Sequence, residues 1–167
     1  MRTSIVIFFI LLSFANHSFG DLIEDVCKNS SDYKLCVNTL RANPKSAFAD
    51  HKGLTRIMLQ LSLAKAKNIQ SQVIILLNQA TKPILKQSLQ ICRDNYGNAV
   101  FMLTNSIKYF DTSAFFSAKI DLAAAVNCCV TCEESFTERD PTRRPVIFSA
   151  VLKQRIRKVK PVFIYYM

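Results

Sequence analysis

Residues 83–110, PILKQSLQICRDNYGNAVFMLTNSIKYF, carry the most regular pattern in the chain and decide its fold. Apolar and small side chains recur there every three or four residues, at Leu85, Leu89, Cys92, Tyr96, Ala99, Leu103, Ser106 and Phe110. This spacing places them on one stripe of an α-helix, with the 3.5-residue period of a packed helix seam. Because a narrow apolar stripe is buried only when helices share a core, the stretch predicts a helical bundle.

The segments on both sides repeat this pattern. A long amphipathic run extends over about residues 51–79, and Thr81-Lys82-Pro83 separates it from the seam helix, since proline is favourable in a first helical turn. Asp111-Thr112-Ser113 offers capping side chains for a further helix over residues 115–136. Three long helices joined by short turns predict an antiparallel bundle. Such a bundle needs a fourth helix, and only the chain after residue 136 can supply it.

Two short helices are predicted near the N-terminus, over residues 21–29 and 33–42. Asn29-Ser30-Ser31-Asp32 separates them with turn and capping residues, and Pro44 follows the second helix as a stop signal. The sequence shows no alternating strand patterns joined by Asn-Gly or Asp-Gly turns. The fold class is therefore all-α.

The first twenty residues have the composition of a secretory signal peptide. Arg2 is followed by an apolar run at residues 5–12 and by Ser18-Phe19-Gly20, which predicts cleavage near Gly20. The run is shorter than the roughly 20 residues of a membrane-spanning helix, with an uncleaved signal anchor as the alternative. We therefore expect a secreted protein, in which Asn29-Ser30-Ser31 fits the acceptor pattern for an N-linked glycan on Asn29.

The basic residues are concentrated near the C-terminus. The whole chain has a formal net charge of +10. Residues 21–136 hold 13 basic and 10 acidic side chains, whereas residues 137–167 hold eight basic and two acidic ones. Because the body is nearly balanced, the sequence argues against nucleic acid as a partner.

Six cysteines in a small secreted chain indicate disulfide bonds, although the number alone leaves their connectivity open. Cys27 and Cys36 lie on two short helices joined by a tight turn, a spacing that suits a staple across a hairpin. Cys92 and Cys132 lie on the seams of two successive long helices, which antiparallel packing can bring together.

Three cysteines lie within residues 127–134, NCCVTCEE. Cys129-Val130-Thr131-Cys132 also fits a redox dithiol, but that motif normally opens a helix beside a strand. A zinc site would need a fourth ligand, and the one histidine of the mature chain, His51, has no neighbouring ligand pattern. We therefore interpret Cys128 and Cys129 as small buried side chains or free thiols.

No catalytic, metal-binding or cofactor-binding site is predicted. Nucleophilic catalysis with a histidine base would depend on His51 alone, and no serine or cysteine is placed to use it. The adjacent carboxylates Glu133 and Glu134 point to different sides of a helix, and the chain has no phosphate-binding glycine loop. The sequence thus indicates a binding protein rather than an enzyme.

An ordered set of motifs resembles the plant invertase and pectin methylesterase inhibitor family. The motifs are Leu22-Ile23-x-x-x-Cys27, Tyr33-x-x-Cys36-x-x-x-Leu40, Asn43-Pro44-Lys45-Ser46-Ala47, Leu54, Leu77-Asn78-Gln79-Ala80-Thr81, Cys92-x-x-Asn95-Tyr96-x-x-Ala99, and Ala124-Ala125 before Thr131-Cys132-Glu133-Glu134-Ser135-Phe136. The resemblance covers about residues 21–136, includes four cysteines at the family's spacing, and stops after Phe136.

The resemblance implies an N-terminal helical hairpin plus an up-and-down four-helix bundle, whose last helix is atypical or incomplete in this chain. It implies the disulfides Cys27–Cys36 and Cys92–Cys132. It divides the chain into a signal peptide at residues 1–20, an inhibitor domain at 21–136 and an atypical basic segment at 137–167. Members of the family block pectin methylesterase or acid invertase in the plant cell wall (apoplast) or vacuole and catalyse nothing themselves.

Pectin methylesterase is the target that the resemblance favours, with acid invertase as the alternative. Residues 78–81 and the lead-in to Cys92 are similar to pectin-side inhibitors, and the Pro-Lys-Phe motif of many invertase inhibitors is absent from residues 109–115. In pectin-side inhibitors, residues near the third and fourth cysteines face the enzyme's substrate cleft. The partner-binding positions this implies are Asp94, Asn98, Thr131 and Glu134. At the positions of Asn98, Phe101 and Ala114 such inhibitors tend to have an acidic residue, which this chain lacks. The alternative is that Asp94 and Glu134 are ordinary solvated charges on helices.

The basic segment after residue 136 has three interpretations. A helix over residues 146–160 could serve as the fourth helix of the bundle, with its basic face in water. The same segment could bind an anionic membrane or pectin, which would define a membrane- or pectin-binding protein instead of an inhibitor. It could also derive from a truncated or misspliced gene, and the remaining three helices would then expose an apolar groove and be poorly stable. A separate alternative is an inactive member of the family that folds but has no target.

Overall fold

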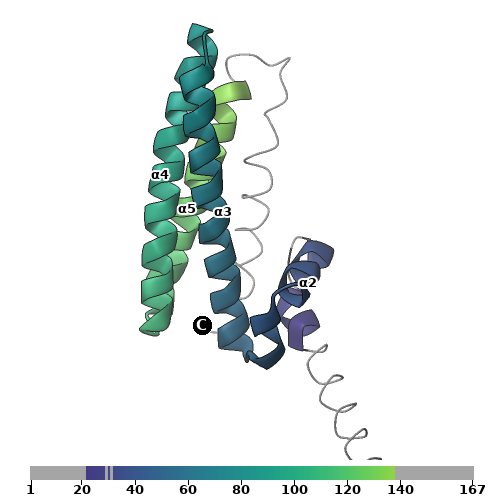
Figure 1. Cartoon of the computed structure of the whole chain (residues 1–167). Helices are drawn as coiled ribbons and strands as arrows, with labels where there is room; N and C mark the ends of the chain where they lie inside the picture. The colour runs from purple at the N-terminus through teal and green to yellow at the C-terminus, as the bar shows by residue number, and fades with distance from the viewer. Residues whose placement is uncertain (1–21, 29, 31, 138–167) are drawn as a thin grey trace, which may run out of the picture.

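The computed structural model describes residues 22–28, 30 and 32–137, and all of its regular structure is helical. Three long helices lie side by side, and a small helical unit lies beside the N-terminal end of the first of them (Figure 1). The prediction of an all-helical fold with short N-terminal helices and long antiparallel helices is confirmed. The predicted signal peptide, the glycan acceptor Asn29 and the last helix of the bundle lie outside the described residues.

The N-terminal unit is a pair of short helices joined by a disulfide. Residues 22–27 are helical, and α2 spans Tyr33–Arg41. Asp32 caps α2, because its Oδ1 accepts a hydrogen bond from the backbone N–H of Leu35 at 2.9 Å. Cys27 and Cys36 form a disulfide with their Cα atoms 5.7 Å apart. The bond holds the two helices together across the predicted turn.

A short 3₁₀ helix leads from this unit to the bundle. It is η1, spanning Pro44–Phe48, and the Asn43 side chain caps it by accepting a hydrogen bond from the backbone N–H of Lys45 at 3.0 Å. The sequence predicts Pro44 as a stop for the preceding helix and not as the start of this short 3₁₀ helix. Proline is favourable in a first helical turn, because its fixed φ suits a helix and its missing N–H needs no partner there.

The three long helices are α3 (His51–Gln79), α4 (Pro83–Asp111) and α5 (Phe115–Thr137). Asp50 caps α3 by accepting a hydrogen bond from Gly53 N–H at 2.7 Å. Between α4 and α5, Ser113 adopts a left-handed φ of 61°, which lets the chain reverse within a few residues. These boundaries agree with the predicted helices at 51–79, 83–110 and 115–136.

The helix α4 packs against both α3 and α5 and makes the main contacts among the three long helices. Its buried residues are Ser88, Leu89, Cys92, Tyr96, Ala99, Leu103, Ser106 and Phe110, which include nearly all of the predicted seam. From α5, Ala118, Leu122 and Ala125 are fully buried. By length and composition alone, residues 115–136 could cross a membrane, but their share of the core and their disulfide to α4 favour a core helix.

Polar contacts join the start of α3 to the end of α4 and to the N-terminal unit. Arg56 donates two hydrogen bonds to the carboxylate of Asp111, at 2.7 and 2.9 Å, and joins α3 to the end of α4. At the N-terminal unit, His51 Nε2 lies 3.2 Å from Asp25 Oδ2. The Lys28 ammonium and His51 lower the pKa of Asp25 by hydrogen bonding to its carboxylate. These contacts orient the short helices and the turn after α4 on α3.

Candidate partner-binding face

The helices α4 and α5 form one rigid unit because a disulfide and buried serines join them. Cys92 and Cys132 form a disulfide with their Cα atoms 4.5 Å apart, so the helix backbones approach closely. Nearby, the buried Ser88 hydroxyl donates to the Ser135 carbonyl at 2.8 Å. The two disulfides of the structure are the pairs that the family resemblance implies.

A third buried serine repeats this contact at the opposite end of the pair. The Ser106 hydroxyl donates to the Ala118 carbonyl at 2.8 Å, and both residues are fully buried. A serine bonded to a neighbouring helix satisfies its hydroxyl while taking little space, so the helices can pack tightly. The register of α4 against α5 is therefore fixed near both ends, and side chains on their outer faces are held in place.

The four predicted partner-binding residues lie on these outer faces. Asp94 and Asn98 are on α4, Thr131 and Glu134 are on α5, and all four are exposed. At about 100° of rotation per residue, Asp94 and Glu134 each lie about 200° around the helix from their nearest disulfide cysteine. They therefore point away from the α4–α5 contact. The four residues lie within about two helical turns of the disulfide cysteines along α4 and α5, and their role in binding remains a prediction.

Asp94 and Thr131 make hydrogen bonds to neighbouring residues of their own helices. The Asp94 carboxylate accepts from Arg93 Nε at 2.8 Å, and this contact raises the pKa of the Arg93 guanidinium. The Thr131 hydroxyl donates to the Asn127 carbonyl at 3.1 Å, which leaves its oxygen able to accept from a partner. The Arg93–Asp94 pair is mostly exposed, so an approaching cation can compete with Arg93 for the carboxylate.

The remaining cysteines form no redox or metal site in the structure. Cys132 is bonded to Cys92, so Cys129-x-x-Cys132 contains only one free thiol. Cys129 is buried, and partial burial raises the pKa of Cys128, which keeps its thiol protonated and unreactive. Among the described residues, no group of three or more histidine, cysteine or acidic side chains could hold a metal ion.

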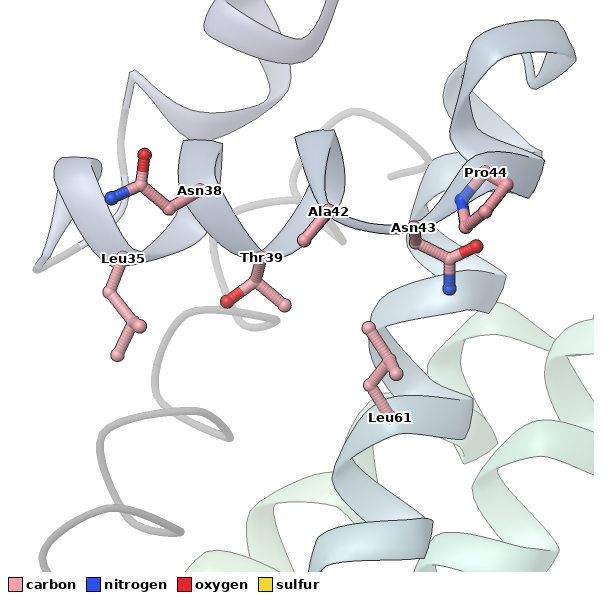
Figure 2. A pocket seen from close by; sticks show the side chains of 7 residues that line it. All are labelled: Leu35, Asn38, Thr39, Ala42, Asn43, Pro44 and Leu61. Atoms are coloured by element: carbon pink, nitrogen blue, oxygen red, sulfur yellow. The ribbon is translucent and has the colours of Figure 1, made fainter.

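A surface depression of about 460 Å³ lies between the N-terminal unit and α3. Figure 2 shows α2, the connection to η1 and Leu61 of α3 around it. Its lining consists of Leu35, Asn38, Thr39, Ala42, Asn43, Pro44 and Leu61. None of these side chains titrates, so the lining has no general acid or base and no group that could activate the Thr39 hydroxyl as a nucleophile.

The fold and its surface define a class of protein: a disulfide-bonded helical module whose exposed faces are held in place by its packed helices. The chain belongs to the plant invertase/pectin methylesterase inhibitor family, whose sequence model matches residues 21–161. It is accordingly a member of an inhibitor family and not an enzyme. The match continues past residue 136, where we expected the resemblance to end, into the basic segment. The division of the chain at residue 136 remains a prediction.

Individual relatives include inhibitors of both kinds of enzyme. The chain is 33% identical over 115 residues to a pectinesterase inhibitor of Actinidia deliciosa, covering 69% of this chain and 62% of that protein, so it spans just under two thirds of that relative. It is 30% identical to a putative invertase inhibitor of Platanus orientalis, over 86% of this chain and 84% of the relative. It is 32% identical to the cell wall / vacuolar inhibitor of fructosidase 2 of Arabidopsis thaliana, over 69% and 64%.

Solved structures share the fold. A pectin methylesterase inhibitor from Arabidopsis thaliana superposes with a TM-score of 0.66 at 16% identity, over 87% of this chain and 95% of that one. A mutant form of such an inhibitor from Arabidopsis superposes with a TM-score of 0.72 at 17% identity, over 83% and 92%. At these identities the similarity shows the helical architecture alone.

Proposed function

We propose that the protein is a secreted inhibitor of pectin methylesterase that lays the outer face of α4 and α5 across the enzyme's substrate cleft. Asp94, Asn98, Thr131 and Glu134 would contact the enzyme. The main support for the proposal is that the Cys92–Cys132 disulfide joins α4 to α5 beside these residues. The chain also belongs to a family of inhibitors. A preformed face loses little conformational entropy on binding, which favours affinity.

Two carboxylates of this face would contribute to the proposed complex by their charge. The side chains of Asp94 and Glu134 are exposed. Basic groups in the enzyme's cleft would attract these carboxylates, and removing their charge would weaken that attraction. The site of action we propose is the apoplast, supported by the cell wall / vacuolar naming of an Arabidopsis relative.

The test is an inhibition assay of the purified protein against pectin methylesterase and acid invertase from acidic to neutral pH. We expect the esterase to be inhibited, and the double variant Asp94→Asn/Glu134→Gln to bind about five- to thirtyfold more weakly, as truncated interface hot spots do. Glu24→Gln is the matched control, because Glu24 is an exposed carboxylate on the N-terminal unit, paired with Arg41. Unchanged esterase rates at micromolar excess of the inhibitor would refute the proposal.

Acid invertase is the second candidate target. The relative from Platanus orientalis and the fructosidase inhibitor of Arabidopsis favour this target. Their sequence identities to this chain are close to that of the pectinesterase inhibitor. The same assay decides between the targets, because inhibition of invertase alone would select this alternative. If neither enzyme is inhibited and removal of residues 138–167 abolishes binding to pectin or vesicles, the protein is a membrane- or pectin-binding protein. If it folds but neither inhibits nor binds, it is an inactive member of the family.

A further inference from the structure

The charges of the described residues are distributed unevenly over the helices. From His51 to Asp111, which spans α3 and α4, the chain has eight lysines and arginines and only two aspartates. The helix α5 has one lysine and three acidic residues, and residues 22–50 have four basic and four acidic ones. The helical body therefore has a strongly basic part, formed by α3 and α4, that its nearly balanced total charge conceals.

The basic residues of α4 follow one side of that helix. Lys86, Arg93 and Lys108 belong to a stripe of positions spaced by three or four residues, at 86, 90, 93, 97, 100, 104 and 108. This stripe borders α3, because a Cβ added at Gly97 would lie 3.3 Å from Nε2 of Gln70. The cations of α4 therefore lie along its junction with α3.

A groove of about 400 Å³ lies at the same junction. Its lining residues are Gln60, Leu63, Ala64 and Lys67 of α3 with Thr104 and Ile107 of α4. Alkyl surface beside amide, hydroxyl and ammonium groups suits a sugar ring, which has apolar C–H faces and polar edges.

Three lysines of this face have no ion pair within the described part of the chain. Arg56 is paired with Asp111 and Arg93 with Asp94, whereas Lys67, Lys86 and Lys108 are exposed and have no carboxylate partner there. Their charges are not neutralised by the body of the protein and are available to an anionic partner.

We propose that the α3–α4 face, defined by Lys67, Lys86, Lys108 and the groove between the two helices, binds a linear acidic polysaccharide of the polyuronate type. Lys86 and Lys108 are 22 residues apart on one helix, which is about 33 Å at 1.5 Å per residue. Cations in a line along the bundle match a linear polyanion. A membrane surface is instead matched by cations that flank one continuous apolar helix face.

The choice of polyuronate among polyanions rests on the proposed function. Hydrolysis of the methyl esters of pectin by the target enzyme leaves carboxylates, so this polymer would be present wherever the inhibitor acts. The α3–α4 face does not include the four residues proposed to contact the enzyme. Binding to the polymer would hold the inhibitor near the polymer's de-esterified regions without occupying the enzyme-binding face.

The experiment measures binding of the full mature chain to polygalacturonate by isothermal titration calorimetry at about 0.1 M salt, where exposed charges more than about 10 Å apart are largely screened. Highly methyl-esterified pectin and anionic phosphatidylserine vesicles are the parallel arms. We expect polygalacturonate to bind most strongly. The variant Lys67→Gln/Lys86→Gln/Lys108→Gln should bind it about tenfold more weakly, from three exposed ion pairs of ordinary strength.

The control Lys28→Gln/Lys34→Gln/Lys45→Gln removes the same charge from the N-terminal region and should weaken binding by less than about twofold, because these lysines lie off the face. Equal weakening by both variants would overturn the proposal, since net charge or the basic C-terminal segment would then drive binding. Tighter binding to vesicles than to polygalacturonate would overturn it in favour of a membrane surface. Esterase inhibition is measured on the same samples, so a failure of the proposed function is seen separately from a failure of polymer binding.

Discussion

Removing the Cys92–Cys132 disulfide should destabilise the protein more than removing Cys27–Cys36. The bonds close loops with sequence separations of 40 and 9 residues. Loop-closure entropy in the unfolded chain then predicts losses of about 3.9 and about 2.7 kcal/mol. The difference of about 1.2 kcal/mol follows from loop length alone. The longer bond also joins two core helices, whereas the shorter lies within a peripheral unit, and this difference in place strengthens the expected order.

The assay is guanidinium unfolding of Cys92→Ala/Cys132→Ala and Cys27→Ala/Cys36→Ala, followed by far-ultraviolet circular dichroism. Both variants carry Cys128→Ala and Cys129→Ala, as does the reference protein, so that free thiols cannot exchange with the remaining disulfide. A larger loss for the N-terminal pair would refute the reasoning from loop length and core position. So would a loss below about 1 kcal/mol for the Cys92–Cys132 pair.

Three further substitutions test particular contacts by the free energy of unfolding. Asp32→Ala should cost about 1 kcal/mol, because it removes the cap that accepts from Leu35 N–H, and Asp32→Asn should restore most of it. Leu103→Ala should cost about 3–5 kcal/mol, because the leucine side chain is fully buried in the α4 seam. Denaturant unfolding should show this loss as a lower midpoint concentration with an unchanged m-value. Arg56→Met should cost about 0.5 kcal/mol at neutral pH, since the pair with Asp111 is half exposed. Because Arg56 lowers the pKa of Asp111, the stability from this pair is present above the ordinary aspartate pKa and is lost as the pH falls through the lowered value. A stability difference between the variant and the parent protein that does not change with pH would contradict the role given to this ion pair.

The boundaries of the long helices could be predicted because local signals mark them. Asp50 and Pro83 stand where α3 and α4 begin, and a cap or an N-terminal proline acts within a few residues of its own position. The buried face of α3 was harder to predict. The three- and four-residue spacing of apolar residues within residues 51–79 places Ala64 and Leu76 on its apolar stripe, but both side chains are exposed.

Polar residues occupy part of the buried face of α3. Thr55 and Ser62 are buried, and their hydroxyls donate to the carbonyls of His51 and Met58 at 2.9 and 2.8 Å, four residues earlier in each case. A hydroxyl that is satisfied within its own helix can enter a core, so a count of apolar residues misplaces the face. The basic α3–α4 face could not be predicted either. Its charges are far apart in the sequence and come together only when the helices pack.

The helix α4 contributes side chains to both proposed binding faces. One side of α4 is joined to α5 by the Cys92–Cys132 disulfide, and the side with Gly97 borders α3. The two proposed binding faces thus share a helix but use different side chains of it. Arg93 borders both faces, because it belongs to the basic stripe of α4 and donates to the Asp94 carboxylate. Inhibition and polymer binding should therefore be separable by substitutions that leave Arg93 and Asp94 in place, with additive effects when both faces are changed.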